Sequence, residues 1–236
     1  VEQWQQIFHS VEVRYVDDEL RADDCSAYLS YIVDRYDDLP NFTVFLHADA
    51  PEHIPTIELL TDTVYAASRG YLPAEAGFIH LAHNYVRHDY RCATVGDCRP
   101  SDVFEFSQLW KKVFSSSISP SMVEGDLNSY CCVQFLVRRD RIRLRSKVFY
   151  ERGLAYFGET ADSYLALFPA GPIVWQRDVR GRTPCQLAMY IWHVMFGEAI
   201  QLPRRHLDPR LPFFVQMLNI EIEAVHEART GIDGKQ

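Results

Sequence analysis

Phe42-Thr43-Val44-Phe45-Leu46-His47-Ala48-Asp49 is the stretch that decides the fold class. Its first five residues are β-branched, aromatic or aliphatic, which is typical of a central strand covered on both faces. His47 and Asp49 follow directly, and a helical pattern begins again near Ile57. Ligands of open α/β sheets bind beyond the carboxyl ends of the strands. The stretch therefore predicts an α/β fold with His47 and Asp49 at a ligand site.

Further elements are expected on both sides of this strand. Apolar residues at helical spacing predict a helix from Asp23 or Asp24 to Tyr36 and a second one from Ile57 to Val64. More strands are expected at Phe78–Leu81 and Cys131–Val137, and an exposed strand at 7–16. The remaining helices are predicted at 148–154, 186–196 and, as an amphipathic helix, 213–228. We expect one α/β domain over residues 1–236.

Composition and charge exclude several classes of protein. The chain has 236 residues and a net charge of -8, which disfavours general binding to nucleic acid. No run approaches the ~18 apolar residues of a membrane span. Six cysteines and the glycosylation sequon Asn41-Phe42-Thr43 favour an oxidising compartment, the secretory lumen or the cell exterior. Cys25 and Cys185 are candidate disulfide partners for the adjacent pair Cys131 and Cys132.

Histidines and carboxylates form two candidate metal sites. In the first, Asp49 would hold Mg or Mn, whereas Zn would favour His47 and His53. The alternative is that Asp49 only caps the next helix. The second set is His80, His83 and His88, which lacks the i, i+4 pair of a zinc-protease helix and is also consistent with structural histidines.

Two further segments contain candidate phosphate-binding or catalytic residues. The basic run from Arg138 to Arg145 can bind phosphate through its guanidinium groups or pair with acidic residues on a solvated helix face. His193 follows Trp192 in an apolar helix, where a buried core histidine is the alternative to a catalyst. No glycine-rich nucleotide loop, phosphate-binding loop or nucleophile elbow is present in the sequence.

Several segments in order resemble an uncharacterised family of fungal, algal and bacterial proteins, catalogued as a domain of unknown function. The segments are Tyr28-Leu29-x-Tyr31-Ile32-Val33-x3-Asp37-x-Leu39-Pro40, Phe42–Ala48, Gly70-Tyr71, Cys131-Cys132-Val133-Gln134-Phe135-x-Val137-x-Arg139-x-Arg141-Ile142, Phe149-Tyr150-Glu151 and Tyr190-x-Trp192-His193-x2-Phe196-Gly197. The resemblance covers about residues 15–200 and leaves 201–236 as a C-terminal extension with the amphipathic helix.

The layout of that family is similar to the GT-A-type glycosyltransferases. The resemblance implies a three-layer α/β/α domain with a mixed, mostly parallel central sheet. It also implies that Asp49, with His47 and His53, holds Mn or Mg, that Asp49 and His193 act in catalysis, and that the donor is a nucleotide sugar. The implied substrate-binding residues are His47, Asp24, Gln134, Arg139 and Arg141. Asp24 stands where the family carries an acidic residue, while many members have His in place of Asp49.

The expected function is the transfer of a sugar from a nucleotide-sugar donor to an unknown acceptor with help from a divalent metal. One alternative is a metal-dependent hydrolase that binds Zn through His47, His53, His80, His83 and His88. Another is a non-catalytic binding domain on a glycosyltransferase-like scaffold, because the family's first strand has no clear counterpart here. Members of the family often follow a membrane anchor or signal, so an anchor outside this chain is also expected.

Overall fold

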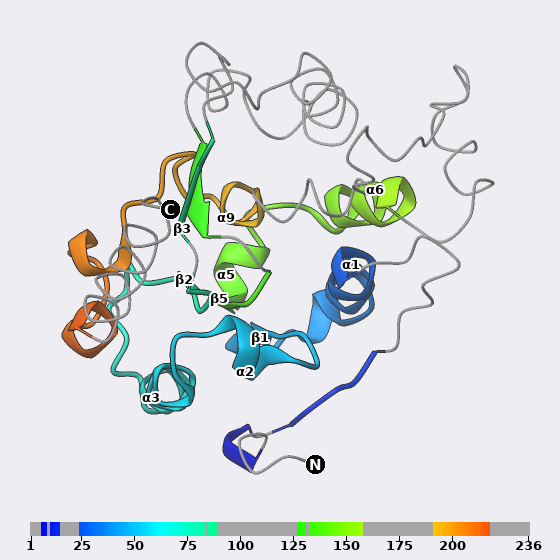
Figure 1. The fold of residues 1–236 in the computed structure, drawn as a ribbon. Helices are drawn as coiled ribbons and strands as arrows, with labels where there is room; N and C mark the ends of the chain where they lie inside the picture. The colour runs from blue at the N-terminus through cyan, green and yellow to red at the C-terminus, as the bar shows by residue number, and fades with distance from the viewer. Residues whose placement is uncertain are drawn as a thin grey trace, which may run out of the picture.

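The computed structural model describes residues 6–8, 10–14, 24–83, 85–88, 127–130, 133–157 and 191–217 (Figure 1). The helices are α1 (Asp24–Arg35), η3 (Tyr36–Asp38), α2 (Ala50–His53), α3 (Ile57–Arg69), α5 (Arg139–Ile142), α6 (Lys147–Phe157), α9 (Trp192–Met195) and η6 (Arg205–Leu207). The strands are β1 (Phe42–Phe45), β2 (Phe78–His80), β3 (Tyr85–His88), β4 (Leu127–Tyr130) and β5 (Phe135–Arg138). A short helix also covers 213–217. None of the described helices is long and apolar enough to cross a membrane.

Helices and strands alternate, which confirms the α/β class, but the described strands pair antiparallel. One sheet has the order β1-β5-β2, and a second pairs β3 with β4. The prediction of a mostly parallel sheet is therefore wrong for the described strands. Phe135, Leu136 and Val137 of β5 are fully buried, and an apolar run of this kind shows only that both faces are covered. It contains no information on the direction of the neighbouring strands.

The sequence predicted β1 as the central strand, but the central strand of the sheet is β5. Among the described strands β1 lies at an edge of its sheet and pairs only with β5. Its residues alternate between half-buried and buried positions, with Phe45 in one core and Val44 against the other. Each face of β1 is thus covered by a different core, and this explains its continuous apolar character.

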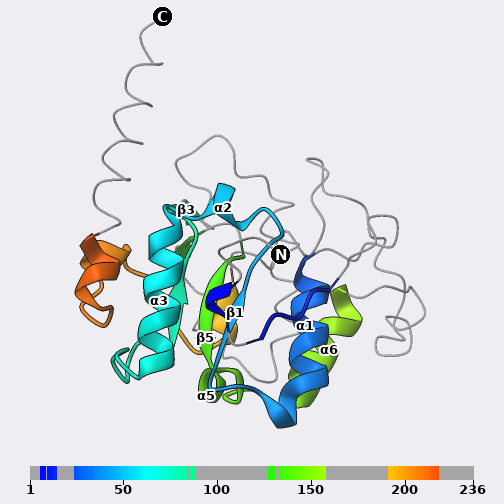
Figure 2. The ribbon, with the colours of Figure 1, turned by 90° about the horizontal axis from the view of Figure 1, so that it is seen from below.

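Two hydrophobic cores lie on opposite faces of the sheet (Figure 2). On one side α1 and α6 cover β5, and Tyr28, Phe135 and Trp192 belong to that core. On the other side α3 packs through Leu59 and Leu60. Burying both faces of one sheet gives three layers, and the hydrophobic effect at about 25 cal/mol per Å² of apolar surface stabilises them.

The helix boundaries follow the local signals in the sequence. The predicted helix at Asp24 is confirmed as α1, and the one near Ile57 is confirmed as α3. Thr56 caps α3 by accepting a hydrogen bond from the backbone N–H of Leu59 (3.2 Å), and Gly70 ends it with a φ of 72°. The exposed strand expected at 7–16 does not form in residues 7–8 and 10–14, the described part of that range.

Candidate functional site

The candidate site lies where β1 ends and α2 begins. A tight turn joins them, because the backbone N–H of Ala50 donates to the carbonyl of His47 (3.2 Å). Pro51 lies in the first turn of α2, where its fixed φ favours helix initiation. His53 follows Asp49 by four residues, so its side chain returns to the same side of the turn.

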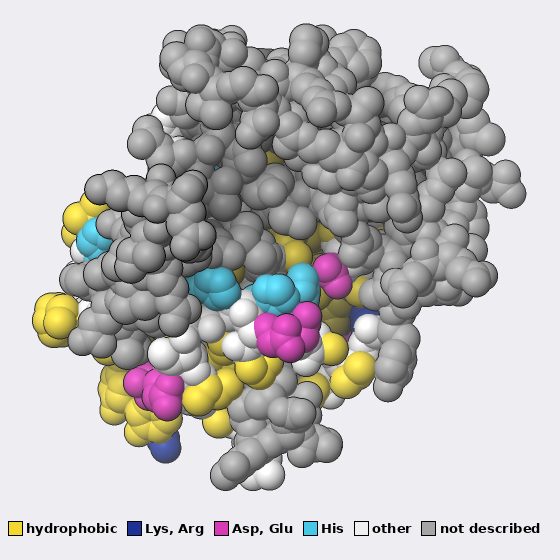
Figure 3. Space-filling view, viewed as in Figure 1, with side chains coloured by type: hydrophobic (Ala, Val, Ile, Leu, Met, Phe, Trp, Pro, Cys, Tyr) yellow, Lys and Arg dark blue, Asp and Glu magenta, His cyan; other side chains and the backbone are white. Residues whose placement is uncertain are grey.

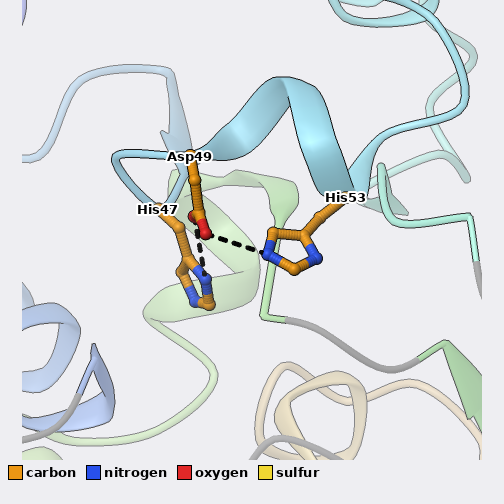
Figure 4. Close-up of side chains that lie close together, drawn as sticks. All are labelled: His47, Asp49 and His53. Carbon is orange, nitrogen blue, oxygen red and sulfur yellow. Dashed lines mark hydrogen bonds and ion pairs between the residues drawn. The ribbon is translucent and has the colours of Figure 1, made fainter.

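Three side chains meet at this turn (Figure 4). Asp49 lies between the two imidazoles, with Oδ1 3.8 Å from Nδ1 of His47 and Oδ2 3.2 Å from Nε2 of His53. One ligand atom from each of the three residues lies within 4.8 Å of the other two. Two imidazole nitrogens and one carboxylate at this separation are a donor set for a divalent transition metal such as Zn, Mn or Fe, rather than for Mg.

Asp24 of α1 completes the group from the opposite side. Its Oδ2 lies 3.0 Å from Nε2 of His47. The two nitrogens of His47 thus face different carboxylates, Nε2 that of Asp24 and Nδ1 that of Asp49. Figure 3 shows histidine and acidic side chains gathered on this face of the molecule. Asp24, which was predicted to contact substrate, therefore lies beside His47 and close to the three-residue group.

The alternative role of Asp49, capping the next helix, is not what its side chain does. Asp49 precedes α2, but its carboxylate makes no capping hydrogen bond to the helix. The carboxylate instead contacts His47 and His53, and about half of the side chain is exposed. The carboxylate is thus available to a ligand from solvent.

The other predicted histidines lie outside this group. In the described part of the chain only His47, Asp49 and His53 form a group of metal-binding type. The backbone N–H of His83 donates to the carbonyl of His53 (3.0 Å), which brings the two loops together. The side chain of His88 lies outside the described residues.

His80 and His193 belong to a buried network instead. The hydroxyl of Ser129 lies 3.3 Å from Nε2 of His80 and 3.2 Å from Nδ1 of His193, while Nε2 of His193 lies 3.2 Å from the carbonyl of Ile200. Burial lowers the pKa of His193 to about 4, and burial together with the charges of His193 and Arg205 lowers the pKa of His80 well below its usual value. Both imidazoles are neutral at pH 7, which fits the core interpretation of His193.

The arginines lie at the opposite end of β1. Arg138 pairs with Phe42 in the register, and the backbone N–H of Arg139 donates to the carbonyl of Asn41 (2.9 Å). The guanidinium of Arg139 donates to the carbonyl of Leu39 and to Oδ1 of Asn41. A four-residue strand separates these groups from His47 by about 13 Å.

Arg141 also has a protein partner, since its Nη2 lies 3.5 Å from the buried carboxylate of Glu198. Arg138 pairs with Asp140, with Nε 2.5 Å from Oδ1. These two contacts agree with the second interpretation of the basic run in that both arginines pair with acidic residues, although Glu198 is buried and not on a solvated face. The structure does not bring Arg139 or Arg141 to the metal-type group.

Gln134 lies at the same end of the sheet as His47. Phe135 pairs with Phe45, and the carbonyl of Gln134 accepts a hydrogen bond from the backbone N–H of Leu81 (2.8 Å). Its fully buried side-chain amide has no hydrogen-bond partner in the described part of the protein. The hydroxyl of Tyr28 is likewise buried and has no hydrogen-bond partner in the described part of the protein.

Cys25 is disulfide-bonded. The other cysteines of the chain lie outside the described residues, and so do residues 186–190 and 218–228 of the two helices predicted near the C-terminus. Asn41 of the sequon is exposed at the surface.

Comparison with protein families matches residues 2–207 to the model described as "Protein of unknown function (DUF3431)". The match confirms that the sequence resembles an uncharacterised family. No curated protein and no solved structure matches the chain.

Proposed function

We propose, since the chain belongs to this family of unknown function, that it is a divalent-metal-dependent transferase that moves a sugar from a nucleotide-sugar donor to an acceptor. The observation that carries the proposal is the convergence of His47, Asp49 and His53, with ligand atoms within 4.8 Å, beyond the carboxyl end of β1. The choice of a sugar-nucleotide substrate rests on the resemblance of the sequence motifs, taken in order, to the layout of the GT-A-type glycosyltransferases.

The residues present fit a divalent cation. His47 Nδ1, a carboxylate oxygen of Asp49 and His53 Nε2 would hold it, and Mn²⁺ accepts this mixture of nitrogen and oxygen more readily than Mg²⁺. A bound cation supplies a Lewis acid that offsets the negative charge on a departing nucleoside diphosphate. Three protein ligands leave the other coordination positions to water or phosphate oxygens.

The contacts and the exposure of the side chains indicate how a donor would reach the metal-type group. Asp24 lies against the other nitrogen of His47, while Asp49 contacts both imidazoles. The side chain of His47 is the least exposed of the three, at 18%, compared with 31% for His53 and 52% for Asp49. A donor would therefore approach from the side of Asp49 and His53.

A second candidate function is a zinc hydrolase. Two imidazoles and one carboxylate are also the ligands of catalytic zinc in several hydrolases. In this case His47, Asp49 and His53 would hold the metal and His80 would not, because His80 contacts Ser129 in the core. The two candidates differ in the substrate that binds beside the metal. The transferase would bind a nucleotide sugar there, and the zinc hydrolase would not.

We also propose that the protein works in the secretory lumen or outside the cell. The disulfide of Cys25 supports this location, because disulfides persist in oxidising compartments and are rare in the cytosol.

A thermal-shift panel tests the proposed function. The purified protein is heated with UDP, GDP, UDP-glucose, UDP-N-acetylglucosamine and GDP-mannose, each with Mn²⁺, with Zn²⁺ or with EDTA. A ligand at a hundredfold excess over its dissociation constant adds about 2.7 kcal/mol to the free energy of unfolding and raises the midpoint. We expect a Mn²⁺-dependent shift with one class of nucleotide sugar.

The other outcomes of the panel separate the alternatives. A shift with Zn²⁺ and none with any nucleotide favours the hydrolase. No shift with any metal or nucleotide contradicts both enzymatic candidates and favours a domain that binds other partners.

A further inference from the structure

Asn41-Phe42-Thr43 is the only Asn-x-Ser/Thr sequence of the chain. In the structure Asn41 occupies an exposed bend directly before β1, and Pro40 before it is exposed as well. An N-linked glycan is bulky, so it requires an asparagine whose side chain reaches solvent in the folded protein. Asn41 meets this requirement.

The hydrogen bonds of Asn41 leave the atom that carries a glycan available. Its side-chain Oδ1 accepts from Nη2 of Arg139 (2.8 Å), and its backbone carbonyl accepts from the N–H of Arg139 (2.9 Å). Both contacts use oxygen atoms, whereas a glycan is attached to the amide nitrogen. Glycosylation of Asn41 is therefore compatible with both hydrogen bonds to Arg139.

The hydroxyl of Thr43 has no role in the described part of the fold. Thr43 lies within β1 on the same face as Phe45 and is 9% exposed. Its Oγ1 is buried and has no hydrogen-bond partner among the described residues. A buried hydroxyl without a partner costs free energy, while valine has the same shape, lacks this cost and is a good strand former. Stability alone thus favours valine at position 43, so the hydroxyl indicates a role before the strand forms.

We propose that Asn41 carries an N-linked glycan, attached while the chain is unfolded, and that Thr43 keeps its hydroxyl for this recognition. The third residue of the sequon must be Ser or Thr, so its hydroxyl belongs to the sequence that is recognised. Folding buries this hydroxyl, and recognition therefore precedes the formation of β1. The inference rests on the proposed secretory location and is independent of the proposed activity.

The attachment is a group transfer from a lipid-linked oligosaccharide diphosphate, which the secretory pathway supplies. The amide nitrogen of Asn41 forms a bond to C1 of the first sugar, and the bond from C1 to the diphosphate oxygen breaks. The amide loses one proton to the glycosylating enzyme, and the lipid diphosphate leaves with the bonding electron pair. The amide oxygen is unchanged and still accepts from Arg139.

A glycan at Asn41 lies away from the metal-type group. Asn41 precedes β1 and His47 follows it, and the four residues of the strand span about 13 Å. Figure 2 shows the start of β1 beside α5 and its other end towards α2. The glycan would thus extend from the α5 end of the sheet and leave His47, Asp49 and His53 open to solvent.

Mass spectrometry of the protein isolated from the cells that produce it tests the proposal, because its own targeting then applies. Peptide N-glycosidase F in heavy-oxygen water converts a glycosylated asparagine into labelled aspartate, which peptide sequencing locates. We expect the label at Asn41 in most of the molecules. An unlabelled Asn41 would overturn the proposal.

Three variants made in the same cells separate recognition from structure. Asn41→Asp keeps an acceptor for Arg139 and should lose the glycan. Thr43→Val should lose the glycan, and its midpoint of unfolding should equal or exceed that of the deglycosylated wild type, because an unpaired buried hydroxyl is removed. Thr43→Ser is the matched control and should keep the glycan. A lower midpoint in Thr43→Val would show that the hydroxyl stabilises the fold and would overturn the role assigned to Thr43.

The state of Cys25 in the same isolated protein distinguishes the failure of the glycan from the failure of the proposed location. If Cys25 is disulfide-bonded and Asn41 is unmodified, only the glycan is wrong. If Cys25 is a free thiol, the proposed location is wrong and the glycan proposal that rests on it is overturned as well. Neither result bears on the binding of metal or nucleotide sugar.

Discussion

We expect the replacement of Asp49 by Asn to lower the affinity for Mn²⁺ or Zn²⁺ by at least about 100-fold and to remove the metal-dependent binding of donor. Asp49 contributes the only carboxylate of the three-residue group, and it contacts both imidazoles. An amide oxygen carries no charge and is a weaker ligand, so the variant loses both a ligand and the charge that neutralises the cation. The affinity is measured by calorimetric titration of the metal into the apo protein.

The matched control is Glu52→Gln, which removes an exposed carboxylate from the adjoining helix α2. We expect this variant to bind the metal as wild type does. The folded state should survive in Asp49→Asn, because the Asp49 carboxylate makes no capping hydrogen bond to α2. Equal metal affinity in Asp49→Asn and wild type would remove Asp49 from the site.

The second large effect is a loss of stability in mild acid through His193. The unfolded chain takes up a proton near pH 6.5, whereas the buried imidazole takes one up only at about pH 4. The unfolded state therefore binds more protons between these values, so the stability is fully present above pH 6.5 and is lost as the pH falls towards 4. The expected loss on going from pH 7 to pH 5 is about 2 kcal/mol from this residue.

Chemical denaturation at several pH values between 7 and 4.5 measures this effect. His193→Gln keeps hydrogen-bonding atoms near Ser129 but cannot be protonated in this range. We expect the variant to be less stable than wild type at pH 7 and to lose less stability on acidification. The same pH dependence in both proteins would show that His193 is not the group responsible.

Much of the fold and part of the site followed from local sequence signals. Asp24 and Thr56 mark the starts of α1 and α3, and the spacing of Asp49 and His53 placed both on one side of a turn. Strand direction did not follow, because an apolar run such as Phe135–Val137 records burial and not the direction of its partners. Which strand is central depends on long-range pairing as well.

The interactions that the sequence did not predict join residues far apart in the chain. Ser129 and His193 are separated by 64 positions, and no spacing rule relates them. The contact of Asp24 with His47 joins a helix to the end of a strand through tertiary packing alone.

Pulsed electron paramagnetic resonance of the protein with one equivalent of Mn²⁺ tests the metal site most directly. The account predicts nitrogen couplings from two coordinated imidazoles, reduced to one in His53→Ala and in His47→Ala. A spectrum without imidazole nitrogen, or one that both variants leave unchanged, would contradict a metal site at His47, Asp49 and His53.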